Sequence, residues 1–191
     1  MRAPPLNLRA PSAVALTLAS IALVGCRGGG RGPSAPAGVV PSSITVTSTS
    51  FRSGGTLPVD FTCDGKNTLP SMTWSAPPPN TRALVLIVED PDAPSGVFTH
   101  FIAFNLPADV PSIKEGADPT SLGALVGRND FNGVQYDGPC PPKGEMHRYA
   151  FRLFALDTPL HLTEGASRAE VDAAMNAHVL GEGTASALFG H

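Results

Sequence analysis

Runs of apolar residues along the chain predict a set of buried strands separated by rigid turns. Residues 83–88 are six consecutive apolar residues, too few to span a membrane and rich in β-branched side chains, which is typical of a strand buried on both faces. A second run, 97–106, carries His100 among aromatic and aliphatic residues. Between the two runs, Asp90 and Asp92 stand among prolines, which fix φ and lack an N–H, so the first strand must end there. The two strands are therefore expected to bring carboxylates and an imidazole to one place.

Shorter patterns complete a mainly β domain with one late helix. Strands are expected over 43–48, 57–63, 72–74 and 148–157, and a loop over 107–127. Apolar residues at helical spacing predict a helix over 167–180, with a capping box between Ser167 and Glu170 and a stop at Gly181. Many strands and little helix favour two packed sheets.

The first 42 residues follow a different pattern from the remainder. Residues 1–25 have early arginines and a short apolar run that ends in Leu-Val-Gly before Cys26, which predicts a lipoprotein signal peptide whose cysteine becomes lipidated. Residues 26–42 then form a Gly/Pro/Ser-rich tether ahead of the domain at 43–191. An ordinary secretory signal, or a retained anchor, is the alternative. Arg27 rather than Asp follows the cysteine, so a bacterial envelope location is expected, in the outer membrane if the host is Gram-negative.

The charge of the chain excludes a nucleic-acid-binding face. The formal net charge is −3, from 13 Lys and Arg against 16 Asp and Glu, and loss of Arg2 and Arg9 with the signal leaves 11 against 16, or −5. Clustered basic residues, which binding to nucleic acid or to anionic lipid would need, are not seen. Membrane association is therefore expected only through Cys26.

Cys63 and Cys140 remain in the domain. Outside the cytoplasm such a pair is available for a disulfide, but the sequence alone cannot place the two within bonding distance. Zinc binding is the weaker alternative, because no C-x-x-C spacing is present.

Two proline-rich loops beside apolar strands carry the candidate chemistry. Asp90 and Asp92 lie in the first, and the second runs from Gly138 to His147. With His100, these groups could surround a small anion, because charged histidine donates from both ring nitrogens. The plainer alternative is that the aspartates cap turns and the histidines are bonded core residues, and the residues alone leave the two alternatives equal.

Longer motifs distinguish between these alternatives. Residues 90–94 (DPDAP), 98–101 (FTHF) with 105–108 (NLPA), and 138–149 (GPCPPKGEMHRY) resemble the bacterial, Raf-kinase-inhibitor-like YbhB/YbcL branch of the phosphatidylethanolamine-binding protein family. The resemblance covers residues 44–190. One departure is that the chain ends in Phe189-Gly-His191, where members of the family usually have a further tail with an aromatic residue.

The resemblance implies a β-sandwich of two sheets with a small anion-binding pocket and one C-terminal helix. It implies binding of phosphate-like or other anionic head groups without catalysis, cofactor or required metal, and in some members inhibition of a kinase or protease as protein target. A metal-assisted hydrolase using the same histidines and aspartates is the alternative. The family geometry also predicts a cis Ala93–Pro94 bond. The pocket residues carried over are Asp90, Asp92, His100, Pro141, Pro142, His147 and Tyr149.

Overall fold

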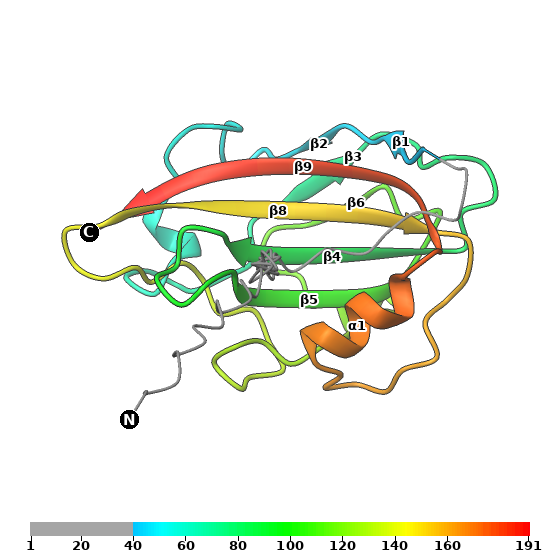
Figure 1. Cartoon of the computed structure of the whole chain (residues 1–191). Coiled ribbons are helices and arrows are strands. Elements are labelled where there is room, and N and C mark those ends of the chain that lie inside the picture. Colours follow the sequence, from blue (N-terminus) through cyan, green and yellow to red (C-terminus); the bar gives the residue numbers. More distant parts are fainter. Residues whose placement is uncertain (1–39) are drawn as a thin grey trace, which may run out of the picture. The chain divides into compact units, whose positions relative to one another are not determined.

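The apolar run at 83–88 lies in the middle of a six-stranded sheet. The computed structural model describes residues 40–191, and in it this run is part of β4 (Ala83–Asp90), all eight residues of which are buried. The strand order is β1-β9-β8-β4-β5-β7, antiparallel throughout except that β1 runs parallel to β9. The other members are β1 (Ser42–Ser43), β5 (Phe98–Pro107), β7 (Leu125–Val126), β8 (Met146–Leu156) and β9 (Val179–Gly190). Figure 1 shows the four long strands side by side.

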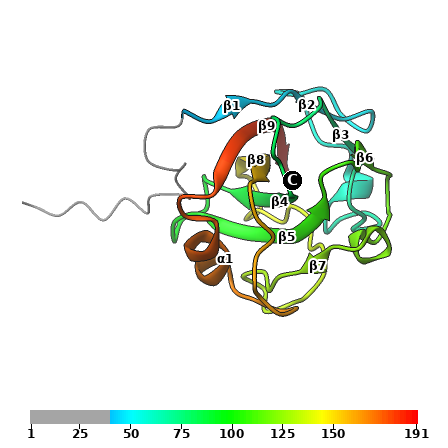
Figure 2. The same ribbon diagram turned by 90° about the vertical axis from the view of Figure 1, so that its right-hand side faces the viewer.

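A small second sheet covers one face of the large one. It contains β2 (Val46–Thr47), β3 (Met72–Trp74) and β6 (Ser112–Ile113) in the order β2-β3-β6. Its side chains pack with the residues of β4 and β8 that point inward, as Trp74, Leu86 and Phe151 do in one apolar cluster. The prediction of a mainly β fold with two sheets is confirmed, and the two layers can be followed in Figure 2.

Helix α1 (Arg168–Met175) covers the opposite face of the large sheet (Figure 2). Val171 and Met175 are fully buried against the outward-pointing residues of β4, such as Val85. The capping box of Ser167 and Glu170 is present, as predicted. Because β4 is covered on both faces, its unbroken apolar run is explained.

Two expected elements differ from the structure. Residues 57–63 do not form a strand, because Pro58 opens a 3₁₀ turn, η1 (Val59–Phe61), in which the N–H of Phe61 donates to the carbonyl of Pro58. Within residues 107–127, expected as a loop, the structure contains β6, β7 and a 3₁₀ turn, η2 (Pro119–Leu122).

The late helix is shorter than predicted. It ends at Met175, and Ala177 takes a left-handed conformation with φ of 65°. The chain then reverses and continues as β9, the longest strand, so Gly181 lies in a strand instead of stopping a helix. β9 was not predicted, because its small residues lack a strand-like apolar alternation.

Candidate functional site

Loops and strand ends at one end of the large sheet enclose a cavity of about 240 Å³. Two histidines and a carboxylate line it, together with aromatic, proline and small residues. A larger cavity of about 370 Å³ lies elsewhere, beside Phe101 and Tyr136, but no histidine or cysteine lines it, so size alone does not identify the site. The lining of the smaller cavity is Asp90, Ala93, Pro94, Ser95, Phe98, His100, Phe131, Cys140, Pro141, Pro142 and His147.

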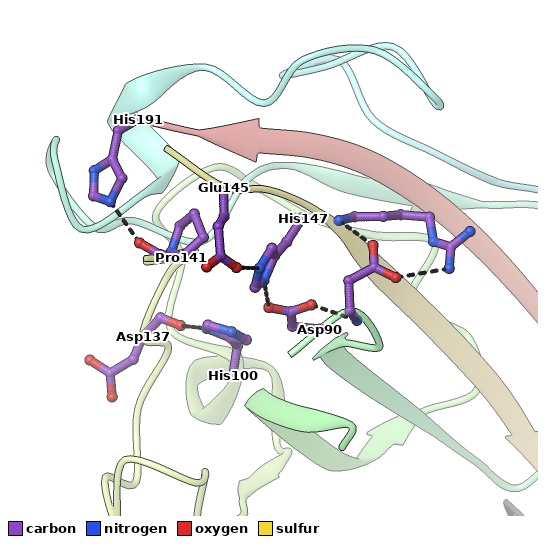
Figure 3. Close-up of polar contacts among 9 residues, drawn as sticks. Asp90, His100, Asp137, Pro141, Glu145, His147 and His191 are labelled. Carbon is purple, nitrogen blue, oxygen red and sulfur yellow. Dashed lines mark hydrogen bonds and ion pairs between the residues drawn. The ribbon is translucent and has the colours of Figure 1, made fainter. Parts of the chain in front are cut away.

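His147 is held by carboxylates at both ring nitrogens. Its Nδ1 lies 2.7 Å from Oδ2 of Asp90, which ends the neighbouring strand β4, and its Nε2 lies 3.1 Å from Oε2 of Glu145 (Figure 3). The side chains of His147 and Asp90 are each 5% exposed, whereas that of Glu145 is 52% exposed. The hydrogen bond to Asp90 raises the pKa of His147, burial opposes this, and the bond to Glu145 adds to it. Both carboxylates thus favour the protonated form of His147.

A β-bulge directs His100 toward the same cavity. Val88 pairs with Phe101 and Glu89 pairs with Thr99, so His100 is an extra residue on β5 with no partner in the register with β4. Nδ1 of His100 lies 2.7 Å from the carbonyl oxygen of Asp137. Burial lowers the pKa of His100, and the hydrogen bond to the Asp137 carbonyl, which raises it, offsets this only in part. The pKa values of the two imidazoles in the cavity are therefore shifted in opposite directions.

Tyr149 lies behind both histidines. Its ring centroid is 5.3 Å from that of His100, edge to face, and 6.5 Å from that of His147, stacked. The side chain is fully buried, and its hydroxyl lies near Asp90 and the backbone of Cys140 without a hydrogen bond of normal geometry to the described residues. Burial raises the pKa of Tyr149, and the nearby Asp90 carboxylate raises it further. Such a buried hydroxyl, without a satisfied hydrogen bond, is uncommon and marks a place where a partner is expected.

One buried amide shapes the loop beside His100. Asn129, 2% exposed, donates to the carbonyl oxygens of His100 and Gln135 and to the carboxylate of Asp137. Its own carbonyl oxygen accepts from the N–H groups of Phe131 and Gly133. The loop thereby positions the ring of Phe131, 5.5 Å from that of His100, as an aromatic wall of the cavity.

A disulfide fixes the opposite wall. Cys140 is bonded to Cys63, with the two Cα atoms 5.5 Å apart, and lines the cavity just ahead of Pro141 and Pro142. The preceding Gly138 passes so close to the chain that a Cβ there would lie 2.3 Å from the carbonyl oxygen of Phe61. In the Gly-Pro-Cys-Pro-Pro sequence, the glycine therefore allows the close approach of two backbone segments, the cysteine forms the cross-link, and the prolines make the loop rigid.

The structure brings together most, but not all, of the residues proposed from sequence. Asp90, His100, Pro141, Pro142 and His147 line the cavity. Tyr149 supports it from behind. Asp92 does not line it: this exposed side chain accepts a hydrogen bond from the backbone N–H of Arg148 at 2.9 Å and fastens the turn to β8.

Other expectations about the site have separate outcomes. All peptide bonds of the described residues are trans, so the prediction of a cis Ala93–Pro94 bond was wrong. Glu145 and Phe131 were missed, since neither belongs to the motif positions carried over, and Glu145 gave no signal beyond its place two residues before His147. Cys26 lies outside the described residues.

Two properties of residues 40–191 bear on the alternatives. No helix in this part of the chain is long and apolar enough to cross a membrane. Nor do three or more histidine, cysteine, aspartate or glutamate side chains gather there in an arrangement suited to a metal ion.

Comparison with known proteins identifies the family to which this fold belongs. The family model described as "Phosphatidylethanolamine-binding protein" matches residues 47–190. E. coli YbcL, whose crystal structure is described as that of a new member of the mammalian PEBP family, superimposes with a TM-score of 0.73 at 34% identity, over 78% of this chain and 98% of YbcL. The chain belongs to the phosphatidylethanolamine-binding protein family.

Two sequence relatives lie in distant organisms. A UPF0098 protein of Methanothermobacter thermautotrophicus is 44% identical over 142 residues, which are 73% of this chain and 93% of the relative. LppC of Mycobacterium tuberculosis, named as a predicted lipoprotein, is 34% identical over 174 residues, 83% of this chain and 85% of LppC.

Proposed function

We propose that this protein binds small phosphate-like anions in the His100–His147 cavity and performs no catalysis there. The carrying observation is His147, a buried imidazole whose pKa is raised by Asp90 and whose second nitrogen already contacts a carboxylate oxygen. An imidazolium held in this way donates a charge-assisted hydrogen bond to any anion at the same position.

The neighbouring groups support the same proposal. The Tyr149 hydroxyl, buried close to both histidines, is a donor without a normal acceptor among the described residues. His100 can take up a proton when an anion approaches, because added negative charge favours the imidazolium. The apolar rings of Phe98 and Phe131 line the cavity, and an apolar wall strengthens these interactions.

We further propose that the binding domain is tethered to the cell envelope through a lipid on Cys26. The Leu-Val-Gly-Cys sequence and the relative named as a lipoprotein support this. The mass of the intact protein extracted from membranes tests it. A lipidated chain beginning at Cys26 is expected, with Cys26→Ala releasing the protein, and an unprocessed N-terminus would contradict it.

Calorimetric titration of the purified protein with inorganic phosphate at pH 6, 7 and 8 tests the binding site. We expect binding that is lost in His147→Ala and that, once the affinity is referred to the doubly charged form of phosphate, strengthens as pH falls. His178→Ala is the matched control, because His178 also pairs with an aspartate, Asp157, at 2.8 Å, but lies at the other end of β8. Equal phosphate binding by the wild type and His147→Ala would exclude this cavity as the site.

A further inference from the structure

Glu145 places a carboxylate of the chain itself at the nitrogen that an anionic ligand would use. Nδ1 of His147 points to Asp90 on β4, so Nε2 is the nitrogen left for a ligand, and Oε2 of Glu145 lies 3.1 Å from it. Figure 3 shows the His147 ring held between the two carboxylates.

The two carboxylates differ in how firmly they are held. Asp90 is buried at a strand end, and its second oxygen also accepts from the backbone N–H of Asp92 at 2.9 Å. The Glu145 side chain is 52% exposed, and within the described structure its carboxylate bonds only to His147. Its backbone N–H donates to the carbonyl oxygen of Pro142, so the side chain stays within reach of His147 even after its carboxylate has turned away.

We propose that Glu145 is an internal competitor for the anion position on His147, and that it restricts the cavity to ligands with a doubly charged phosphate group. The ligand class is thus inorganic phosphate or a phosphate monoester, in preference to a phosphodiester or a carboxylate. This inference rests on the proposed function, since it specifies which anions the same cavity accepts.

The selectivity follows from comparing each ligand with Glu145. A free carboxylate offers His147 the same group that Glu145 offers, but Glu145 is tethered and acts at an effective concentration on the order of millimolar. Exchange for a carboxylate therefore gains nothing. A phosphodiester also carries one charge and is no stronger a competitor.

A phosphate monoester differs in charge and in acceptor number. It carries a charge of about −1.5 to −2 near pH 7 and three strong acceptor oxygens. One oxygen can replace Glu145 at His147, while others remain for His100, which lines the same cavity, and for the hydroxyl of Tyr149, whose ring stacks on that of His147. The displaced Glu145 carboxylate, being half exposed, returns to water at little cost.

Titrations of three anions into three proteins test the inference. The anions are inorganic phosphate, dimethyl phosphate and acetate at pH 7.5, and the proteins are the wild type, Glu145→Gln and Glu182→Gln. Glu182 is the matched control, because its side chain is also 52% exposed and also forms one ion pair, at 3.6 Å to Arg152, but near the far end of β8.

We expect the wild type and Glu182→Gln to bind phosphate more tightly than either monoanion. Glu145→Gln should bind dimethyl phosphate and acetate roughly fivefold more tightly, the value of one partly exposed ion pair, and the preference for phosphate should shrink. Glu145→Ala should behave in the same way, which excludes an effect specific to glutamine.

A measurement without ligand tests the contact itself. NMR titration of the His147 ring should show its pKa falling in Glu145→Gln and unchanged in Glu182→Gln. If phosphate binding requires His147 but neither selectivity nor this pKa responds to Glu145, the competitor role is overturned and the anion site stands. If none of the proteins binds phosphate, the proposed function fails, and this inference fails with it.

Discussion

Glu89 and Asp90 are neighbours in the chain, yet their carboxylates bind basic side chains on opposite faces of β4. Glu89 points to the helix side, where its carboxylate lies 2.6 Å from Arg168 and 3.1 Å from Arg152. Asp90 points to the cavity, where it lies 2.7 Å from His147. Because successive residues of a strand alternate between faces, one dipeptide serves both the fold and the site.

Replacing Asp90 should weaken ligand binding more than it weakens the fold. In Asp90→Asn, His147 loses its charged partner, so its pKa should fall. Loss of one hydrogen bond to a charged group corresponds to a drop in phosphate affinity of about tenfold. Calorimetry and NMR titration of His147 measure the two effects. A variant with normal affinity would show that Asp90 does not prepare His147 for an anion.

Replacing Glu89 should have the converse effect. Glu89→Gln leaves two arginines without their shared carboxylate beneath α1, which should lower the free energy of unfolding by about 2 kcal/mol. Phosphate affinity should stay unchanged, because the side chain points away from the cavity. Urea unfolding and calorimetry on the same sample check this, and a loss of affinity comparable to that of Asp90→Asn would contradict it.

The two histidines should give stability opposite dependences on pH. The folded-state pKa of His147 is raised above 6.5, so its contribution is fully present below 6.5 and is lost as pH rises through the higher folded value. The folded-state pKa of His100 is lowered, so its contribution is present above 6.5 and is lost as pH falls below that value.

Because these effects partly cancel in the wild type, single variants are needed to separate them. Urea unfolding from pH 5 to 9 should show the difference between wild type and His147→Gln shrinking as pH rises. The difference for His100→Gln should shrink as pH falls. The same trend in both variants would contradict the assigned directions.

Removing the Tyr149 hydroxyl should separate stability from binding. Tyr149→Phe eliminates a buried polar group without a normal hydrogen bond, a group that costs about 1–3 kcal/mol when unpaired. The variant should therefore unfold at equal or higher urea concentration than the wild type, while binding phosphate more weakly. A marked loss of stability would show that the hydroxyl is already paired in the folded protein.

Breaking the disulfide should affect both properties. Cys63 and Cys140 are 77 residues apart, and a cross-link closing a loop of this length contributes about 4 kcal/mol. Cys63→Ser should lose about this amount. Phosphate affinity should also fall, because Cys140 anchors the wall formed by Pro141 and Pro142. Wild-type protein treated with a dithiol reductant should resemble the variant, and unchanged affinity in both would show that the wall holds without the bond.

The elements with dense apolar patterns could be predicted from sequence. β4, β5 and β8 have long runs of large apolar residues, and each lies within two residues of its expected bounds at either end. β9 could not be predicted, since its glycines pack through close approach of the backbone, with a Cβ at Gly183 falling 2.0 Å from the carbonyl oxygen of Ile44. Such complementarity between distant segments leaves no local periodicity.

The site was predictable to the extent that its motif is local. Asp90 and His147 follow from the resemblance, and their contact follows from the pairing of β4 with β8. The positions of Asp92 and Glu145 depend on which way a side chain turns out of a loop, toward Arg148 in one case and toward His147 in the other. Residue type and spacing do not determine that direction.

The bulge on β5 also means that the presence of an imidazole in the cavity depends on one extra residue in that strand. Were Thr99 and Phe101 separated by a regular step, the imidazole would share the side of the sheet occupied by Ile102 and Phe104, under the helix. A single inserted residue therefore supplies the cavity with its second imidazole. If these cavity residues were transferred to another antiparallel sheet, the one-residue bulge would have to be transferred with them. Without the bulge, the imidazole would point to the helix-covered face of the sheet and away from the cavity.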